Sequence, residues 1–193
     1  MRNSAVLPKI GDVLPQTPSR RAFTVRATLV ATLLATLLCV ETAAAQSTIF
    51  IVRHAEKATG GDPKDPELSP GGRARAEALA QTLKDAGLTA VFATEYKRTQ
   101  QTAEPIARAA NVDVTIVPAK ETDRLLAKLK ETRGNVLVVG HSNTVPEIVK
   151  ALGVADLLTI DESEYDNLFV LAPVTPPTLA RLHIAAPAPT GSP

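Results

Sequence analysis

The sequence has no tryptophan, one cysteine and three histidines among 193 residues, and aromatic residues make up only 3% of it. Its single cysteine, Cys39, cannot form a disulfide within the chain, and it lies in an N-terminal segment that we expect to be removed. Neither a disulfide framework nor a thiolate metal site is therefore expected, so stability has to come from an ordinary hydrophobic core. Few aromatics and a near balance of 21 basic and 20 acidic residues give no support to nucleic-acid binding.

The N-terminal 45 residues have the pattern of a secretory signal peptide. An apolar run at residues 27–40 follows several arginines, and an Ala-x-Ala site predicts cleavage after Ala45. The run is shorter than the ~20 apolar residues of a membrane span. Residues 19–25 leave a twin-arginine export signal open beside the general secretory route. We therefore expect an exported protein, periplasmic or secreted, with no stable membrane insertion after cleavage.

Residues 46–186 are expected to form one domain in which apolar, β-branched runs alternate with segments of helical period. The expected strands are 48–52, 90–94, 114–117, 135–139, 167–172 and 179–185, and the expected helices are 69–87, 97–111, 122–134 and 144–153. Pro105 predicts a bend or a break in the second helix. This alternation predicts a three-layer α/β/α fold with a mainly parallel central sheet. The Pro-rich residues 187–193 are expected to be a disordered tail.

Polar residues follow four successive strands of this expected sheet. His54 follows the first strand, Arg98 begins the helix after the second, Glu121 follows the third, and His141 follows the fourth. Each alone has an ordinary structural reading, such as a hydrogen-bonded histidine or a favourable first-turn charge. In such sheets, however, ligands bind outside the carboxyl ends of the strands. The convergence of these residues with Arg53 at one edge therefore predicts an anion site.

The same residues carry a resemblance to a known family. Residues 52–56 read Val-Arg-His-Ala-Glu, a Gly-His-Ser-Asn-Thr segment begins at Gly140, and residues 94–103 fit Ser-x-x-x-Arg-x-x-Gln-Thr-Ala with Thr94 in place of serine. Three motifs in this order resemble the histidine phosphatase superfamily, which has the phosphoglycerate mutase-like fold. The resemblance spans essentially the whole domain, and Ala55 replaces the usual glycine by another small residue.

The resemblance implies a role for each of four residues. His54 would attack phosphorus and form a phosphohistidine, Arg53 and Arg98 would bind the phosphoryl group, and His141 would stabilise that group as an imidazolium. The chemistry also stands on physical grounds, because guanidinium forks neutralise phosphate oxygens and a neutral imidazole is a competent nucleophile near neutral pH. No metal and no other cofactor is implied.

The source of the proton for the leaving group is less decided. Family members supply a carboxylate either from a loop well after the middle arginine or directly after the final histidine. Ser142 occupies the second place, so we favour Glu121 in the first, with Glu56 as its rival. Glu56 could instead orient Arg53.

Ser142 and Asn143 have two readings. Their side chains could donate hydrogen bonds to phosphate, or they could cap the helix that is expected to begin near Thr144. Capping is expected of at least one of them.

These features favour a phosphomonoester hydrolase over three alternatives. A phosphoglycerate mutase-type phosphotransferase would need larger loops over the site. An exported binding module without turnover could use the same arginines and histidines, and a metal protein could use His54, His141 and His183. The expected substrate is a small phosphorylated molecule, such as a sugar phosphate of the cell envelope, or a phosphoprotein.

Overall fold

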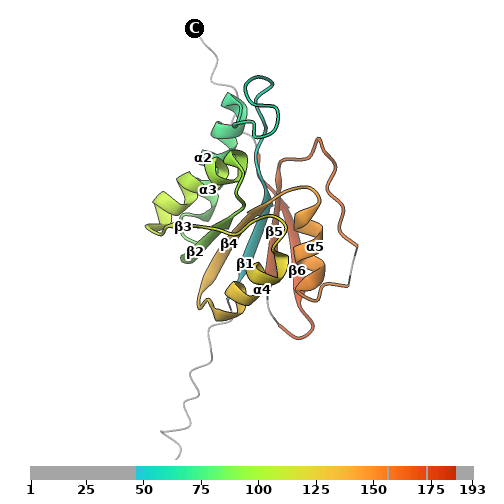
Figure 1. Ribbon diagram of the computed structural model, residues 1–193. Helices are drawn as coiled ribbons and strands as arrows, with labels where there is room; N and C mark the ends of the chain where they lie inside the picture. The colour runs from blue at the N-terminus through green and yellow to red at the C-terminus, as the bar shows by residue number, and fades with distance from the viewer. Residues whose placement is uncertain (1–46, 156, 173, 186–193) are drawn as a thin grey trace, which may run out of the picture. The chain divides into compact units, whose positions relative to one another are not determined.

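The computed structural model describes residues 47–155, 157–172 and 174–185 (Figure 1). The expected signal peptide at 1–45 and the expected tail at 187–193 lie outside these residues. Within the described ranges, no helix is both long enough and apolar enough to cross a membrane.

A six-stranded sheet with the order β3-β2-β4-β1-β5-β6 forms the centre of the domain (Figure 1). The strands are β1 (Ile49–Arg53), β2 (Leu88–Ala93), β3 (Val114–Ile116), β4 (Asn135–Gly140), β5 (Asn167–Ala172) and β6 (Thr178–His183), and the helices are α2 (Pro70–Leu83), α3 (Lys97–Ala110), α4 (Thr122–Glu131) and α5 (Thr144–Ala151). Strands β1 to β4 are parallel, whereas β5 and β6 are antiparallel to their neighbours. The predicted three-layer fold with a mainly parallel sheet is confirmed.

Each face of the sheet carries its own hydrophobic core. Helices α4 and α5 cover one face, through residues such as Leu125 and Val145, and α2 and α3 cover the other, through residues such as Leu79 and Ile106. Successive residues of β1 alternate between the two cores, because side chains of a strand point to opposite faces. The strands in the middle of the sheet are therefore apolar on both faces, which explains their nearly continuous hydrophobic sequences.

Helix ends follow the expected chemistry, with one difference. Ser69 caps α2 by accepting a hydrogen bond from the backbone N–H of Gly72 at 3.0 Å, and α3 ends at Asn111 in the left-handed conformation. One expectation about the interior of α3 is not met, because Pro105 lies inside the helix without dividing it. The buried apolar face of α3 outweighs the one hydrogen bond that a proline removes.

The strand register brings the expected site residues together. Arg53 at the end of β1 pairs with Gly140 at the end of β4, and the backbone N–H of His54 donates to the Gly140 carbonyl at 2.9 Å. Strand β2 lies on the other side of β4 and ends at the same edge of the sheet, because its last residue, Ala93, pairs with Val139. The residues that follow β1, β2 and β4 therefore meet at one edge of the sheet.

Candidate active site

A pocket of about 550 Å³ lies at this edge. Its lining includes Arg53, His54, Arg98 and His141, the four residues that the sequence predicts for phosphate chemistry. The two imidazole rings meet edge to face with their centroids 5.3 Å apart. The structure therefore gathers into one pocket four side chains that are widely separated in the chain.

A hydrogen bond to the backbone fixes which ring nitrogen of His54 carries the proton. Its Nδ1 lies 2.7 Å from the carbonyl oxygen of Ala55, which can only accept, so Nδ1 carries the proton and Nε2 keeps its lone pair. Burial is the main reason that the pKa of His54 falls from 6.5 to about 3, and the charges of Arg98 and Arg53 lower it further. His54 is thus neutral and nucleophilic at Nε2 across the physiological range.

His141 is oriented by a chain of two buried threonines. The Thr99 hydroxyl lies 2.7 Å from the carbonyl of Tyr96 and donates to it, so it accepts from the Thr94 hydroxyl 2.8 Å away. The Thr94 oxygen must then accept from Nε2 of His141, which lies 3.0 Å away. This chain places the proton on Nε2 and leaves Nδ1 facing Nη2 of Arg98 at 3.5 Å.

His141 is neutral in the empty pocket. Burial, followed by the charge of Arg98, lowers its pKa from 6.5 to about 4. The imidazolium expected from the family resemblance therefore requires an anion in the pocket, because a negative charge beside the ring favours its protonated form.

Arg53 is clamped by the loop that precedes β5. Its Nη1 donates to the carbonyls of Asp161 and Glu164 at 2.8 and 3.1 Å, and its Nη2 contacts Oε2 of Glu162 at 2.5 Å. The guanidinium also stacks on the Tyr165 ring, 4.3 Å from its centroid. These contacts fix the plane of a side chain that is only 2% exposed.

Arg98 reaches the same pocket from the first turn of α3. Its guanidinium lies over the Tyr96 ring, 4.3 Å from the centroid, and Nη1 is 3.9 Å from the Asp65 carboxylate. Within the described part of the chain, the buried Nε atoms of both Arg98 and Arg53 have no hydrogen-bond partner. Buried donors without partners are costly, and both guanidinium groups are incompletely paired beside the pocket that they line.

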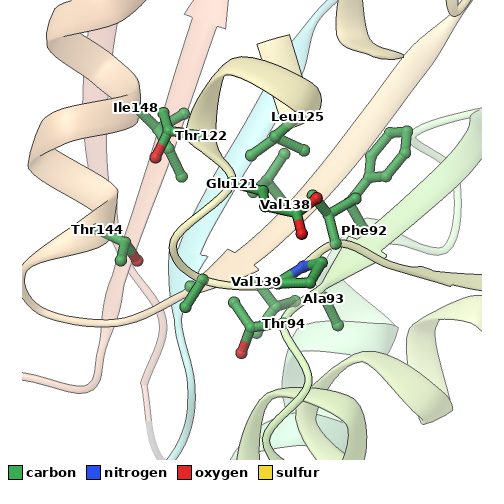
Figure 2. Close-up of a pocket in the computed structure, with 14 residues that line it drawn as sticks. Phe92, Ala93, Thr94, Glu121, Thr122, Leu125, Val138, Val139, Thr144 and Ile148 are labelled. Atoms are coloured by element: carbon green, nitrogen blue, oxygen red, sulfur yellow. The ribbon is translucent and has the colours of Figure 1, made fainter. Parts of the chain in front are cut away.

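The two candidate proton donors are engaged elsewhere. Oε2 of Glu121 lies 2.9 Å from Nη1 of Arg124. Figure 2 shows Glu121 with Leu125 in a neighbouring, mainly apolar pocket, which shares Ala119, Thr122 and Thr144 with the pocket of the two histidines. The carboxylate of Glu56 binds Nε and Nη2 of Arg75 at 2.6 to 3.0 Å. Burial alone would raise the pKa of Glu56, but the Arg75 hydrogen bonds outweigh it and hold the pKa below its usual value. Neither glutamate lines the pocket of the two histidines.

Ser142 and Asn143 both line the pocket, and neither caps the helix through its side chain. The expectation that at least one of them caps the helix is wrong, because Asn143 stands at the N-cap position of α5 but makes no side-chain cap bond. The Ser142 hydroxyl contacts Oε1 of Glu162 at 2.5 Å instead. The Thr144 hydroxyl accepts from the backbone N–H of His141 at 2.9 Å and so secures this turn.

Sequence reasoning missed Glu162, Tyr165 and the role of Thr94. Thr94 was visible in the middle motif, where its spacing to Thr99 could have suggested a buried pair. Glu162 and Tyr165 belong to an acidic loop whose place depends on the direction of β5. Because β5 is antiparallel to β1, it begins at the carboxyl edge, and the residues just before it reach the pocket.

The geometry agrees with comparisons with known proteins. The family model described as histidine phosphatase superfamily (branch 1) matches residues 49–126. This range contains the first two motifs, with Arg53, His54 and Arg98.

Solved structures share the fold. A structure of the protein histidine phosphatase SixA with tungstate matches with a TM-score of 0.58 and 19% identity, over 70% of this chain and 96% of that one. A SixA protein from Agrobacterium tumefaciens matches with a TM-score of 0.55 and 23% identity, over 71% and 98%. A mycobacterial glucosyl-3-phosphoglycerate phosphatase with inorganic phosphate matches with a TM-score of 0.57 and 14% identity, over 72% and 98%.

Proposed function

We propose that this chain is a phosphatase of the histidine phosphatase superfamily, whose model matches residues 49–126, and that it hydrolyses phosphomonoesters through a phosphohistidine intermediate on His54. The observation that carries the proposal is the pairing of a neutral His54, free at Nε2, with two buried guanidinium groups whose Nε–H groups lack partners in the described chain. A dianionic phosphoryl group offers acceptors to the two guanidinium groups and becomes less repulsive to a nucleophile once its charge is neutralised.

The reaction proceeds in two displacements. The Nε2 lone pair of His54 attacks phosphorus, the bond to the substrate oxygen breaks, and that oxygen leaves as an alkoxide that must take up a proton. Water then attacks the phosphohistidine, the phosphorus–nitrogen bond breaks, and phosphate leaves with Nε2 restored. The Ala55 carbonyl holds the proton on Nδ1 and balances the positive charge that the ring acquires when Nε2 is phosphorylated.

His141 assists the transfer at the phosphoryl oxygens. Its Nε2–H is committed to Thr94, so Nδ1 is the nitrogen that faces Arg98 and the bound anion. The arriving dianion raises the pKa of His141, and protonated Nδ1 donates a hydrogen bond as negative charge redistributes in the transition state. None of these roles requires a metal ion, so turnover is expected to persist in a chelator.

Hydrolysis is favoured over phosphoryl return to a bound intermediate. Residues 94–96 and 141–143 make short connections at the pocket, and residues 54–69 and 152–166 make longer ones; a mutase has to exclude water with large loops that cover the site. The solved relatives described above are named as phosphatases, one for protein histidine and one for a phosphorylated sugar acid. These names support a phosphoprotein or a sugar-containing phosphomonoester as the substrate, and an envelope sugar phosphate is our proposal within the second class.

Export is a further part of the proposal. If residues 1–45 direct export and are removed, mature protein recovered from the periplasm or the medium begins at Gln46. N-terminal sequencing of that protein tests the site, and blocking the twin-arginine or the general secretory route separates the two export pathways. Full-length protein retained in the cytoplasm would contradict the export proposal.

The first experiment is hydrolysis of p-nitrophenyl phosphate by residues 46–193 in EDTA. We expect turnover in the wild type, loss of turnover in His54→Ala, and wild-type turnover in His183→Ala, which changes an exposed histidine paired with Asp166 at 3.0 Å outside the pocket. Unchanged turnover in His54→Ala would refute the phosphohistidine mechanism. Absence of turnover in the wild type on this substrate and on a panel of sugar phosphates and phosphoproteins, with phosphate still bound, would favour the binding module.

A further inference from the structure

Two glutamates, Glu147 and Glu162, line the pocket in the described part of the chain, and Glu162 is the one that contacts Arg53 and Ser142. Oε2 of Glu162 contacts Nη2 of Arg53 at 2.5 Å, and Oε1 contacts the Ser142 hydroxyl at 2.5 Å. The Glu162 side chain is nevertheless 75% exposed, whereas that of Arg53 is 2% exposed. The carboxylate thus reaches in from solvent and occupies donors that a phosphoryl group needs.

The loop beneath Glu162 is held firmly, so this contact is built into the fold. The Asp161 carboxylate accepts from the backbone N–H and the hydroxyl of Ser163 at 3.0 and 2.9 Å. The Glu164 carboxylate accepts from the backbone N–H of Asp161 at 3.0 Å and from Nη2 of Arg181 at 3.1 Å. These hydrogen bonds hold the backbone on both sides of residue 162, from which the side chain reaches Arg53 and Ser142.

We propose that Glu162 is the acid–base residue of the reaction, giving a proton to the leaving oxygen in the first step and taking one from water in the second. The inference rests on the proposed phosphatase function. It replaces Glu121 and Glu56, whose carboxylates are bound to Arg124 and Arg75 outside the pocket.

The protons and electrons balance across the two steps. When Nε2 of His54 attacks phosphorus, the phosphorus–oxygen bond breaks and the leaving oxygen takes the proton of the Glu162 carboxylic acid, giving an alcohol and a carboxylate. When water attacks the phosphohistidine, the Glu162 carboxylate takes one water proton, and the phosphorus–nitrogen bond breaks. Phosphate departs, and both His54 and protonated Glu162 are restored.

Substrate binding itself prepares Glu162 for this role. In the empty pocket the Ser142 hydrogen bond, and then the charge of Arg53, hold the pKa of Glu162 below its usual value. A phosphoryl dianion that takes over these donors removes both effects and adds a negative charge nearby, and each change raises the pKa. Lys57 also lowers the pKa of Glu162, and the pocket holds Lys120, Glu147 and His141 as well, of which the dianion favours the protonated form of His141.

The test compares leaving groups that differ in their need for a proton. Nitrophenolate leaves from p-nitrophenyl phosphate as a stable anion, whereas an alkoxide from glycerol phosphate must be protonated. In Glu162→Gln we expect kcat/KM to fall by about 100-fold or more on glycerol phosphate and to change little on p-nitrophenyl phosphate. On the latter substrate a burst of nitrophenolate should precede a slow steady state, because the phosphohistidine now lacks its base.

Three comparisons make the outcome decisive. Glu77→Gln, in an exposed ion pair with Arg108 at 3.3 Å, is the matched control and should behave as the wild type on both substrates. An equal fall in kcat/KM on both substrates in Glu162→Gln would overturn the inference, because it would mean that Glu162 only positions Arg53. The inference would also be overturned if kcat/KM fell on glycerol phosphate but not on p-nitrophenyl phosphate in Glu121→Gln rather than in Glu162→Gln. A wild type that turns over neither substrate would count against the phosphatase function itself, which His54→Ala tests separately.

Discussion

Mild acid should destabilise this protein strongly, because folding buries two histidines in their neutral form. The side chains of His54 and His141 have pKa values of about 3 and about 4, against 6.5 in an unfolded chain, chiefly because they are buried. Between these values the unfolded chain binds protons that the folded chain does not. Stability therefore falls as the pH drops below about 6.5, and it continues to fall until the folded-state pKa values are reached.

The size of this effect follows from the shifts. One pKa unit corresponds to about 1.4 kcal/mol, so lowering the pH from 7 to 5 costs about 2 kcal/mol for each histidine and about 4 kcal/mol for both. Typical stabilities are about 5–15 kcal/mol, which makes this loss large. The carboxyl groups of Glu56, Asp161 and Glu162 have lowered pKa values and affect stability only in more acidic solution, so the range from pH 5 to 7 isolates the histidines.

Urea unfolding at the two pH values measures the effect. A loss of about 4 kcal/mol corresponds to a fall of about 2 M in the midpoint at a typical slope for a domain of this size. His54→Asn and His141→Asn should each remove about half of the difference between pH 7 and pH 5, whatever they do to stability at pH 7. A wild-type midpoint that is the same at both pH values, or variants that keep the full difference, would refute the reasoning.

Three further predictions concern single contacts. Arg98→Lys keeps the charge but loses the planar fork, so kcat/KM should fall about 10- to 100-fold; retention of full activity would mean that Arg98 acts only through its charge. Thr94→Val removes the acceptor for Nε2 of His141, so ¹⁵N NMR should report a changed ring tautomer together with a lower kcat, and an unchanged tautomer would contradict the threonine chain. Gly72→Ala would set a Cβ 2.3 Å from the Glu56 carbonyl oxygen, so it should lower the free energy of unfolding by about 1–3 kcal/mol, whereas alanine normally stabilises a helix.

The sequence predicted the part of the site that depends on parallel strand ends. His54, Arg98 and His141 each follow an apolar run in a strand–helix alternation, and parallel strands of one sheet have to place such residues at one edge. Neither the pairing of Arg53 with Gly140 nor the order of the strands was needed for that conclusion. The same pattern predicted two-sided burial and so the three layers.

The sequence could not predict how individual carboxylates are used. Glu121 lies near the correct edge, but its side chain turns to Arg124, three residues further along α4, and a pattern of residue types does not reveal such a rotamer. Glu162 reaches the pocket only because β5 runs antiparallel to β1, and apolar runs alone do not give the direction of a strand. Its contact with Arg53 spans 109 positions and has no local signal.

The most direct test of the central claim is to trap the phosphorylated enzyme. The protein is denatured during turnover of p-nitrophenyl phosphate, digested under alkaline conditions, and searched for a phosphorylated peptide by mass spectrometry. The account predicts one phosphoryl group on the peptide that contains His54, stable to alkali, labile to acid, and absent from His54→Ala. A phosphoryl group on another residue, or wild-type turnover in the variant without any trapped intermediate, would contradict it.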